Sequence, residues 1–420
     1  MVRKLDLGEV VRRPLVVFRV RRECEAMTTP EPLQDTPDFS LVLGGPLFQA
    51  FRRAHLSGTA LELQRRRVLV ITAIAWLPLL LLSAAGGQFL RGQGLPFLRD
   101  IEVHVRFLIA LPALIMAELT VHRRIQPVMK TFVERGIVTA EDTPRFHAAI
   151  EAAMKARNSI SWETTLLVFV YTLGHWVWRN ELALGTATWY ALPEGTSPHL
   201  TLPGYWYAFI SIPIMQFVIL RWYFRVVIWS GLLWRVSRLN LRLLPAHPDG
   251  AGGIGFLGRI THAFGPLLFA QGAMLAGIIA NRIFYQGDSL LSFKLNIVAL
   301  VGFFVLVILG PLAVFTPNLL EAKRRGLGEY GALATSYVAH FDEKWLRGGA
   351  KDEAILGTGD IQSLADLGNS FAVVRDMRAV PFTLSDVIAL VAMTAFPLLP
   401  LALTVVPLEE LLSRLVKVIF

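Results

Sequence analysis

The segment VLVITAIAWLPLLLLSAAG (residues 68–86) directly follows Arg65, Arg66 and Arg67 and contains no charged residue. An α-helix rises about 1.5 Å per residue, so about 20 apolar residues are needed to cross roughly 30 Å of bilayer hydrocarbon. Six further segments have a similar length and character. The seven candidate spans are Val68–Gly86, Ile101–Val121, Trp162–Trp178, Tyr205–Arg225, Ile260–Asn281, Leu295–Phe315 and Asp386–Val406. The mean hydropathy of +0.51 agrees with this interpretation. We therefore predict an all-α polytopic membrane protein with about seven transmembrane helices.

The basic residues are distributed unevenly between the two sides of the predicted spans. The chain has 41 Lys and Arg residues against 32 Asp and Glu residues. The inner flanks, on the side of the N-terminus, contain Arg65, Arg66, Arg67, Arg123, Arg124, Lys130, Arg235, Arg238, Arg242, Lys323, Arg324 and Arg325. The outer flanks contain Arg91, Arg99, Arg179, Arg282, Lys294, Arg414 and Lys417. This asymmetry predicts a multi-pass protein of a bacterial-type inner membrane with a cytoplasmic N-terminus. The basic excess then serves topology and binding to anionic lipid headgroups rather than to nucleic acid.

Four regions follow one another along the chain. Residues 1–67 are predicted to form a cytoplasmic tail that ends in an interfacial amphipathic helix, because apolar residues alternate there with arginines. Residues 68–315 are predicted to hold the first six spans, with a cytoplasmic hairpin extension at 122–161. Apolar residues at helical spacing predict a cytoplasmic helical segment over 316–385. Residues 386–420 are predicted to form the last span and a C-terminal amphipathic segment. A cytoplasmic helical layer without a β-sheet is therefore expected.

A glycine-rich loop, PAHPDGAGGIGFLG (residues 245–258), contains the pattern Gly-x-Gly-x-x-Gly twice. A dinucleotide site is excluded, because that motif must leave a parallel strand and a helix precedes this loop. Backbone N–H groups in such a turn can instead surround an anion. The predicted anion or lipid-headgroup site contains Arg242, His247, Gly250, Gly252, Gly253 and Arg259. The alternative interpretation is a tight turn whose glycines only let helices approach closely.

Arg221 and Arg225 lie one helical turn apart near the inner end of the fourth span. An arginine at the hydrocarbon centre costs roughly 2.5–3.5 kcal/mol on insertion scales, so such residues are functional candidates. In one interpretation both side chains line an ion path or bind an anionic headgroup, and together with the glycine loop they form one anion site. In the other interpretation they extend to the lipid phosphates without a further role.

A second group of ionisable residues lies at the predicted outer ends of the spans. It comprises Asp100, Glu102, His104, Arg106, His175 and Arg282. Asp100 and His104, like Glu102 and Arg106, are four residues apart and so share one face of a helix. The group is interpreted either as proton or ion sites or as an interfacial collar of salt bridges.

Local enzyme motifs are absent: the sequence has no His-Glu-x-x-His, no phosphate-binding loop and no Gly-x-Ser-x-Gly. The single cysteine, Cys24, and the scattered histidines predict no metal site, and no cofactor is expected. The outline of seven spans with a thick helical layer on the N-terminal side is similar to that of insect chemoreceptor-type channels, without a shared residue motif. We predict a channel- or transporter-like protein, with a homo-oligomer as its expected assembly. The alternatives are a membrane sensor or scaffold that signals through its cytoplasmic helices, and a membrane-embedded lipid-processing enzyme.

Overall fold

Six helical segments are long and apolar enough to cross a membrane. The computed structural model describes residues 39–53, 63–90, 94–177, 188–194, 197–349 and 358–404. Within this part of the chain the six segments are Gln64–Ala85, Ile101–Glu134, Leu202–Val236, Phe256–Gln286, Leu290–Leu346 and Leu384–Ala402. The prediction of an all-α polytopic membrane protein is confirmed, and the chain is an integral membrane protein.

Most of the six segments contain several consecutive helical elements. They comprise α3 (Gln64–Ala85), α4 (Ile101–His104), η2 (Val105–Ala110), α5 (Leu111–Glu134), α9 (Leu202–Trp206), η5 (Tyr207–Ser211), α10 (Ile212–Val236), α11 (Phe256–Ile260), η6 (Thr261–Phe264), α12 (Gly265–Asn281), η7 (Arg282–Gln286), η8 (Leu290–Phe293), α13 (Lys294–Leu309), η9 (Gly310–Phe315), α14 (Thr316–Phe341), η10 (Asp342–Leu346), α16 (Leu384–Ala395), η11 (Phe396–Leu398) and α17 (Leu399–Ala402). The other described helices are α2 (Pro46–Arg53), η1 (Phe97–Arg99), α6 (Thr143–Arg157), α7 (Ile160–Phe169), η3 (Val170–Gly174), α8 (His175–Val177) and α15 (Asp360–Arg375). Strands β1 (Ala191–Glu194) and β2 (Ser197–Leu200) form an antiparallel hairpin, which the sequence analysis does not predict.

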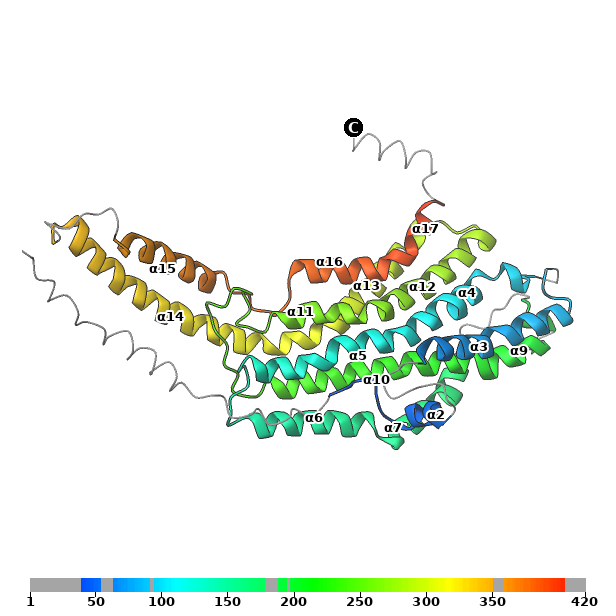
Figure 1. The fold of residues 1–420 in the computed structure, drawn as a ribbon. Coiled ribbons are helices and arrows are strands. Elements are labelled where there is room, and N and C mark those ends of the chain that lie inside the picture. The colour runs from blue at the N-terminus through cyan, green and yellow to red at the C-terminus, as the bar shows by residue number, and fades with distance from the viewer. Residues whose placement is uncertain are drawn as a thin grey trace, which may run out of the picture. The chain divides into compact units, whose positions relative to one another are not determined.

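Helix α12 lies at the centre of the bundle, packed against α5 and α16 (Figure 1). Its candidate span is 72% buried, the highest value among the six. Small residues allow this packing: a Cβ added at Gly272 would overlap with the backbone carbonyl of Thr394 in α16. Helices in membranes associate through such close backbone approaches, because lipid and side chains are equally apolar.

A proline within α3 is compensated by a neighbouring helix. Pro78 has no N–H, so the carbonyl of Ile74 loses its intrahelical donor. Trp206 donates its Nε1–H to this carbonyl at 3.1 Å. The hydrogen bond satisfies the carbonyl and joins α9 to α3.

One end of the bundle is defined by Asp100, and we call it the Asp100 end. The carboxylate of Asp100 accepts hydrogen bonds from Trp189 Nε1 and Asn281 Nδ2, both at 2.8 Å. Leu95 pairs with Thr188 in an isolated β-bridge. The segments before α4, before β1 and after α12 therefore meet at this end.

The opposite end is the α14 end, from which α14 and α15 extend (Figure 1). Here Val138 pairs with Leu241, which joins the turn after α5 to the loop after α10. The N–H of Gly258 donates to Pro381 at 3.1 Å, which joins α11 to the segment before α16. The chain thus reaches this end after α5, after α10 and again before α16.

The predicted span Trp162–Trp178 is not one of the six segments, yet the chain passes between the two ends in this region. We call α7, η3 and α8 the third pass. Residues 142–177 lead from the α14 end toward the Asp100 end. The ring of Trp162 lies 5.3 Å from that of Phe224, and Tyr171 donates to the carbonyl of Phe209 at 3.3 Å. Residues 209 to 224 correspond to about 22 Å of helix, so α7 and its continuation lie antiparallel beside α10 over most of a membrane thickness. Glu163 reduces the mean hydropathy of this pass, although its side chain faces Arg221 of α10.

Helices α14 and α15, which follow α13 and η9 in the chain, form a helical hairpin. Its base packs against the loop that follows α10: a Cβ at Gly326 would overlap with Pro245 and lie 3.0 Å from Val374. Lys323 donates to the carbonyl of Met377 at 2.8 Å. The predicted boundary at residue 316 falls within a continuous helical path from α13 through η9 into α14.

The direction of the third pass is testable by labelling with a maleimide that cannot cross membranes. Single cysteines replacing Glu141, His199 or Gln286 are made in a Cys24→Ser background, because Cys24 is the only native cysteine. We expect His199→Cys and Gln286→Cys to react from one side of the membrane and Glu141→Cys from the other. Reaction of Glu141→Cys and His199→Cys from the same side would show that residues 142–188 do not cross.

Candidate functional site

Arg221 and Arg225 of α10 are buried inside the bundle. Arg221 and Arg225 are 8% and 3% exposed, although their spacing of one turn also allows a lipid-facing position. Arg225 Nη2 donates to Glu118 Oε1 at 2.8 Å, and its guanidinium lies 4.9 Å from the ring centroid of Trp222. Neither side chain therefore extends to lipid phosphate in this structure.

Glu118 of α5 is the shared partner of three arginines. Arg67 of α3 forms an ion pair with Oε2, while Arg225 and Arg221 approach Oε1 at 2.8 Å and 3.5 Å. Arg221 also lies 3.6 Å from Glu163 of α7. We call Arg67, Glu118, Glu163, Arg221 and Arg225 the charge cluster. Three guanidinium groups and two carboxylates give these five side chains a formal charge of +1.

The charge cluster lies near the predicted inner boundary of the hydrocarbon. Arg221 follows Leu202 by 19 residues, which correspond to about 29 Å of helix. The exposed Arg65 and Arg66 mark the same level at the start of α3. Beyond this level α5, α6 and α10 continue as the helical layer of the α14 end (Figure 1).

A small cavity adjoins the charge cluster. Its volume is about 20 Å³, and Ile71, Ile115, Val218 and Trp222 line it together with the arginines and Glu118. About 10–15 Å³ is sufficient for one water molecule. The cavity has polar partners for a water molecule, but it is too small for a hydrated ion.

Residues 39–48 cover the charge cluster from the α14 end. Ser40 Oγ lies 2.9 Å from His122 Nδ1, and the carbonyl of Ser40 accepts a hydrogen bond from Arg157. Gly45 adopts a φ of +88°, and a Cβ at this position would lie 2.9 Å from Glu163 Oε1. Burial and the nearby Arg225 lower the pKa of Arg157 to about 10. The positive field of the charge cluster therefore extends to its covering segment.

The glycine loop surrounds an anion that belongs to the protein itself. The carboxylate of Asp249 accepts hydrogen bonds from the N–H groups of Ala251, Gly253 and Gly255, at 2.8, 3.1 and 2.8 Å. Burial opposes ionisation of Asp249, but these bonds and the contact with His247 hold its pKa below the ordinary value.

The other predicted loop residues have different environments. Gly252 adopts a φ of +65°, and a Cβ there would lie 3.1 Å from that of Leu243. Gly250 also has a positive φ and accepts a hydrogen bond from the N–H of Arg378. Arg242 and Arg259 are exposed. The structure thus places the two halves of the predicted anion site in separate environments, the arginines with Glu118 and the loop around Asp249.

The residues predicted at the outer ends are divided among several contacts. Glu102 and Arg106 form the expected ion pair, and Arg106 Nη1 donates to Tyr207 at 2.6 Å. His104 Nδ1 instead accepts a hydrogen bond from Trp76 Nε1 at 3.1 Å, so it does not pair with Asp100. The Asp100 carboxylate joins Trp189, Asn281 and the N–H of Val103.

The two remaining outer residues contact aromatic rings. His175 stacks on Phe209 with ring centroids 4.9 Å apart, and Arg282 lies 5.8 Å from the ring centroid of Phe293. Neither joins the Asp100 carboxylate, so the structure does not gather the predicted outer residues into one site.

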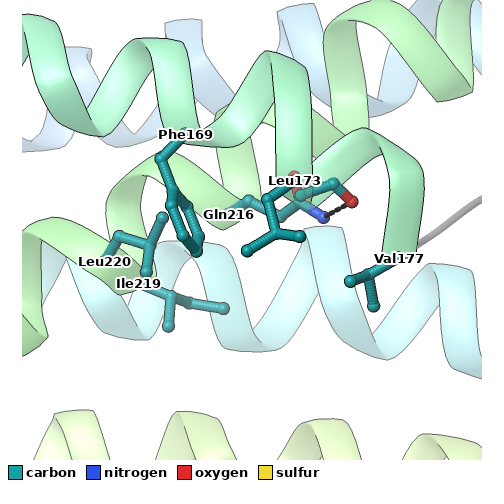
Figure 2. Close-up of a pocket in the computed structure, with 7 residues that line it drawn as sticks. Phe169, Leu173, Val177, Gln216, Ile219 and Leu220 are labelled. Atoms are coloured by element: carbon teal, nitrogen blue, oxygen red, sulfur yellow. Dashed lines mark hydrogen bonds between the residues drawn. The ribbon is translucent and has the colours of Figure 1, made fainter.

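An apolar groove of about 240 Å³ opens between the third pass and α10. Figure 2 shows Phe169, Leu173 and Val177 on one side and Ile219 and Leu220 on the other. Gln216 donates its Nε2–H to the carbonyl of Gly174 at 3.1 Å, as the dashed line indicates. This polar contact lies deeper in the membrane than the charge cluster and joins the two helices.

The sequence analysis does not identify Arg67, Glu118 and Glu163 as members of one site. Arg67 has the same sequence environment as Arg65 and Arg66, and Glu118 has His122 as a nearer partner on its own helix. The available signal is Glu118 itself, a carboxylate within an apolar segment that requires a buried cation.

Comparison of the chain with protein families, curated proteins and solved structures finds no match. Among the described residues there is also no group of three or more His, Cys, Asp or Glu side chains arranged to hold a metal ion.

Removal of the shared carboxylate should weaken the α14 end of the bundle. Glu118→Gln leaves three arginines without their buried counter-charge, and loss of one partner from a buried pair costs roughly 3–5 kcal/mol. We expect a clear fall in the midpoint of thermal unfolding, with a smaller fall for Glu163→Gln, whose ion pair with Arg221 is longer, at 3.6 Å. Equal midpoints for both variants and the wild type would contradict this role.

The glycine loop should depend on the charge of Asp249. Asn at this position keeps one acceptor oxygen but offers an NH₂ group to one of the loop N–H donors. We expect Asp249→Asn to accelerate amide exchange over residues 251–255 by about tenfold. Because the folded pKa is lowered, the stabilisation is complete above the ordinary value of 3.8 and is lost as the pH falls through the folded value. Exchange that does not change in the variant or at low pH would show that Asp249 does not hold the loop.

Proposed function

We propose that the protein is a channel- or transporter-like membrane protein that passes small anions, with the charge cluster as their binding site. The observation that carries this proposal is the excess of positive charge: Arg67, Arg221 and Arg225 are nearly fully buried, and among the described residues they form ion pairs with two carboxylates. Several buried cations close together repel one another, and a bound anion would stabilise them.

The proposal requires a second conformation. The side chains of the charge cluster are at most 11% exposed, and the adjoining cavity holds no more than about one water. Arg106 and Glu118 are ionisable residues near the two ends of the second span, and about 18 Å of helix separates them. Buried Ala110, Leu111 and Leu114 lie between them. The described conformation therefore corresponds to a closed state of the proposed path.

Anion flux into liposomes containing the purified protein tests the proposal. Chloride entry is followed with an enclosed halide-quenched dye, in neutral phosphatidylcholine vesicles. We expect Arg225→Gln to reduce flux at least tenfold, because the long polar side chain remains but its charge is lost, while Arg225→Lys retains part of it. The matched control is Arg235→Gln, which changes an exposed arginine on the same helix.

If vesicles that contain the wild-type protein take up chloride no faster than empty vesicles, the proposal is wrong. Unchanged flux in a folded Arg225→Gln protein would reject the charge cluster as the site. If flux is absent but the wild type, unlike the variant, retains an anionic phospholipid through purification, the ligand is a headgroup phosphate and the protein is not an anion path.

A second function, that of a membrane sensor or scaffold, is favoured by the hairpin of α14 and α15. Beyond its base the hairpin exposes four apolar side chains that are 49–74% accessible, those of Leu333, Val338, Leu346 and Ile361. Exposed apolar residues on an extended element are typical of contact surfaces. Purification of the full-length protein with a specific cytosolic partner that is lost on Leu333→Ser would support this function.

A further inference from the structure

A polar pocket of about 180 Å³ lies where the loop after α10 meets the first turns of α14. It is lined by Leu239, Asn240, Leu241, Leu243, Asn318, Glu321, Ala322 and Arg325. We propose that this pocket binds a small zwitterion that carries an ammonium and a carboxylate group, as a free amino acid does. The proposal is independent of the anion path, because the pocket shares no residue with the charge cluster.

Glu321 and Arg325 supply the two opposite charges. They lie one turn apart on α14, a spacing at which side chains are neighbours on one helix face. Glu321 makes no hydrogen bond or ion pair with the described part of the chain, and Arg325 makes one long contact, from Nη2 to the carbonyl of Leu243 at 3.5 Å. An acid and a base that remain separate at this spacing can each bind the opposite charge of a ligand placed between them.

Two amide side chains complete the polar lining. Asn240 and Asn318 have no side-chain hydrogen bond to the described residues, so their donors and acceptors are available to a ligand. Leu239 and Leu243 are buried, so their side chains lie in the core and leave mainly polar groups at the pocket surface.

The loop wall of the pocket is held in place independently of any ligand. The N–H of Asn240 donates to Asp142 at 2.7 Å, and the N–H of Arg242 donates to Ile137 at 2.8 Å. The bond from Asn240 is the main reason that the pKa of Asp142 is lowered, so this acceptor stays ionised at neutral pH. A preformed wall reduces the ordering cost of binding.

A zwitterion fits this lining better than a simple ion does. The pocket presents one carboxylate and one guanidinium, so its charged groups have no net charge and do not favour a lone anion or cation. Each charge-assisted hydrogen bond is about twice as strong as a neutral one, and a zwitterion forms such bonds at both ends. The volume of about 180 Å³ restricts the ligand to a small molecule.

Binding is measured on the full-length protein by equilibrium dialysis with radiolabelled glycine, alanine and glutamine. Acetate and methylammonium serve as competitors that carry only one of the two charges. We expect at least one of the amino acids to bind and each single-charge competitor to be at least tenfold weaker, because each loses one charged contact. Glu321→Gln and Arg325→Gln should each weaken binding at least tenfold.

The controls are Glu329→Gln and Arg324→Gln, which change exposed residues of α14 outside the pocket and should leave binding unchanged. Because Glu321 and Arg325 are exposed, the variants are expected to fold, and an unchanged unfolding midpoint checks this. If none of the three amino acids binds the wild type, the proposal is wrong. It is also wrong if binding persists in both pocket variants, or if acetate binds as tightly as the amino acids and only Arg325→Gln weakens it.

Discussion

The carboxylate of Glu118, shared by arginines from α3 and α10, fixes the α14 end of the bundle. One side chain of α5 thereby joins α3, α5 and α10. Glu163 connects α7 to the same group through Arg221. Ion pairs in a low-dielectric interior resist partial separation, because each charge left behind is desolvated and unpaired. The relative positions of these helices along their axes are therefore set by charge as well as by apolar packing. The covering segment at residues 39–48 depends on the same arrangement, since it packs where His122, Arg157 and Glu163 converge.

The shared carboxylate also determines how the bundle can move. If α10 shifts, Arg221 and Arg225 lose Glu118 together, because both belong to one helix. A gradual displacement is therefore unfavourable, and two discrete arrangements are expected, as in packed interfaces that switch. At the Asp100 end the contacts are of another kind: a single carboxylate accepts neutral donors from Trp189 and Asn281. These bonds are charge-assisted at the acceptor alone, so breaking them leaves one unpaired charge rather than two, and opening at the Asp100 end is less costly.

The sequence predicts the helical class and most spans, because hydrophobic length is a local property that survives folding. Its limits appear at particular residues. Glu163 and His175 reduce the hydropathy of the third pass, although they face α10 rather than lipid. Glu118 has a local partner in His122 by helical spacing, but its three arginines are 51, 103 and 107 residues away in sequence, and the geometry that joins them exists only in the folded bundle. The glycine loop is a related case. Its pattern indicates N–H groups around an anion, and the anion is the adjacent Asp249, whose short side chain reaches the turn that follows it.

Helix α10 connects the proposed sites because of its position in the chain. Its membrane half carries Arg221 and Arg225, and the loop that follows it forms one wall of the polar pocket at the base of α14. The other wall continues without interruption from α13 through η9, and η9 itself packs against α10. A ligand bound between the loop and α14 would hold the ends of two passes together, and one of these passes, α10, contributes to three of the four ion pairs described for the charge cluster. Such a ligand can change the equilibrium of the bundle only if the pocket differs between its two arrangements. The short loop after α10 transmits a shift of that helix directly to the pocket wall, so the pocket is expected to differ.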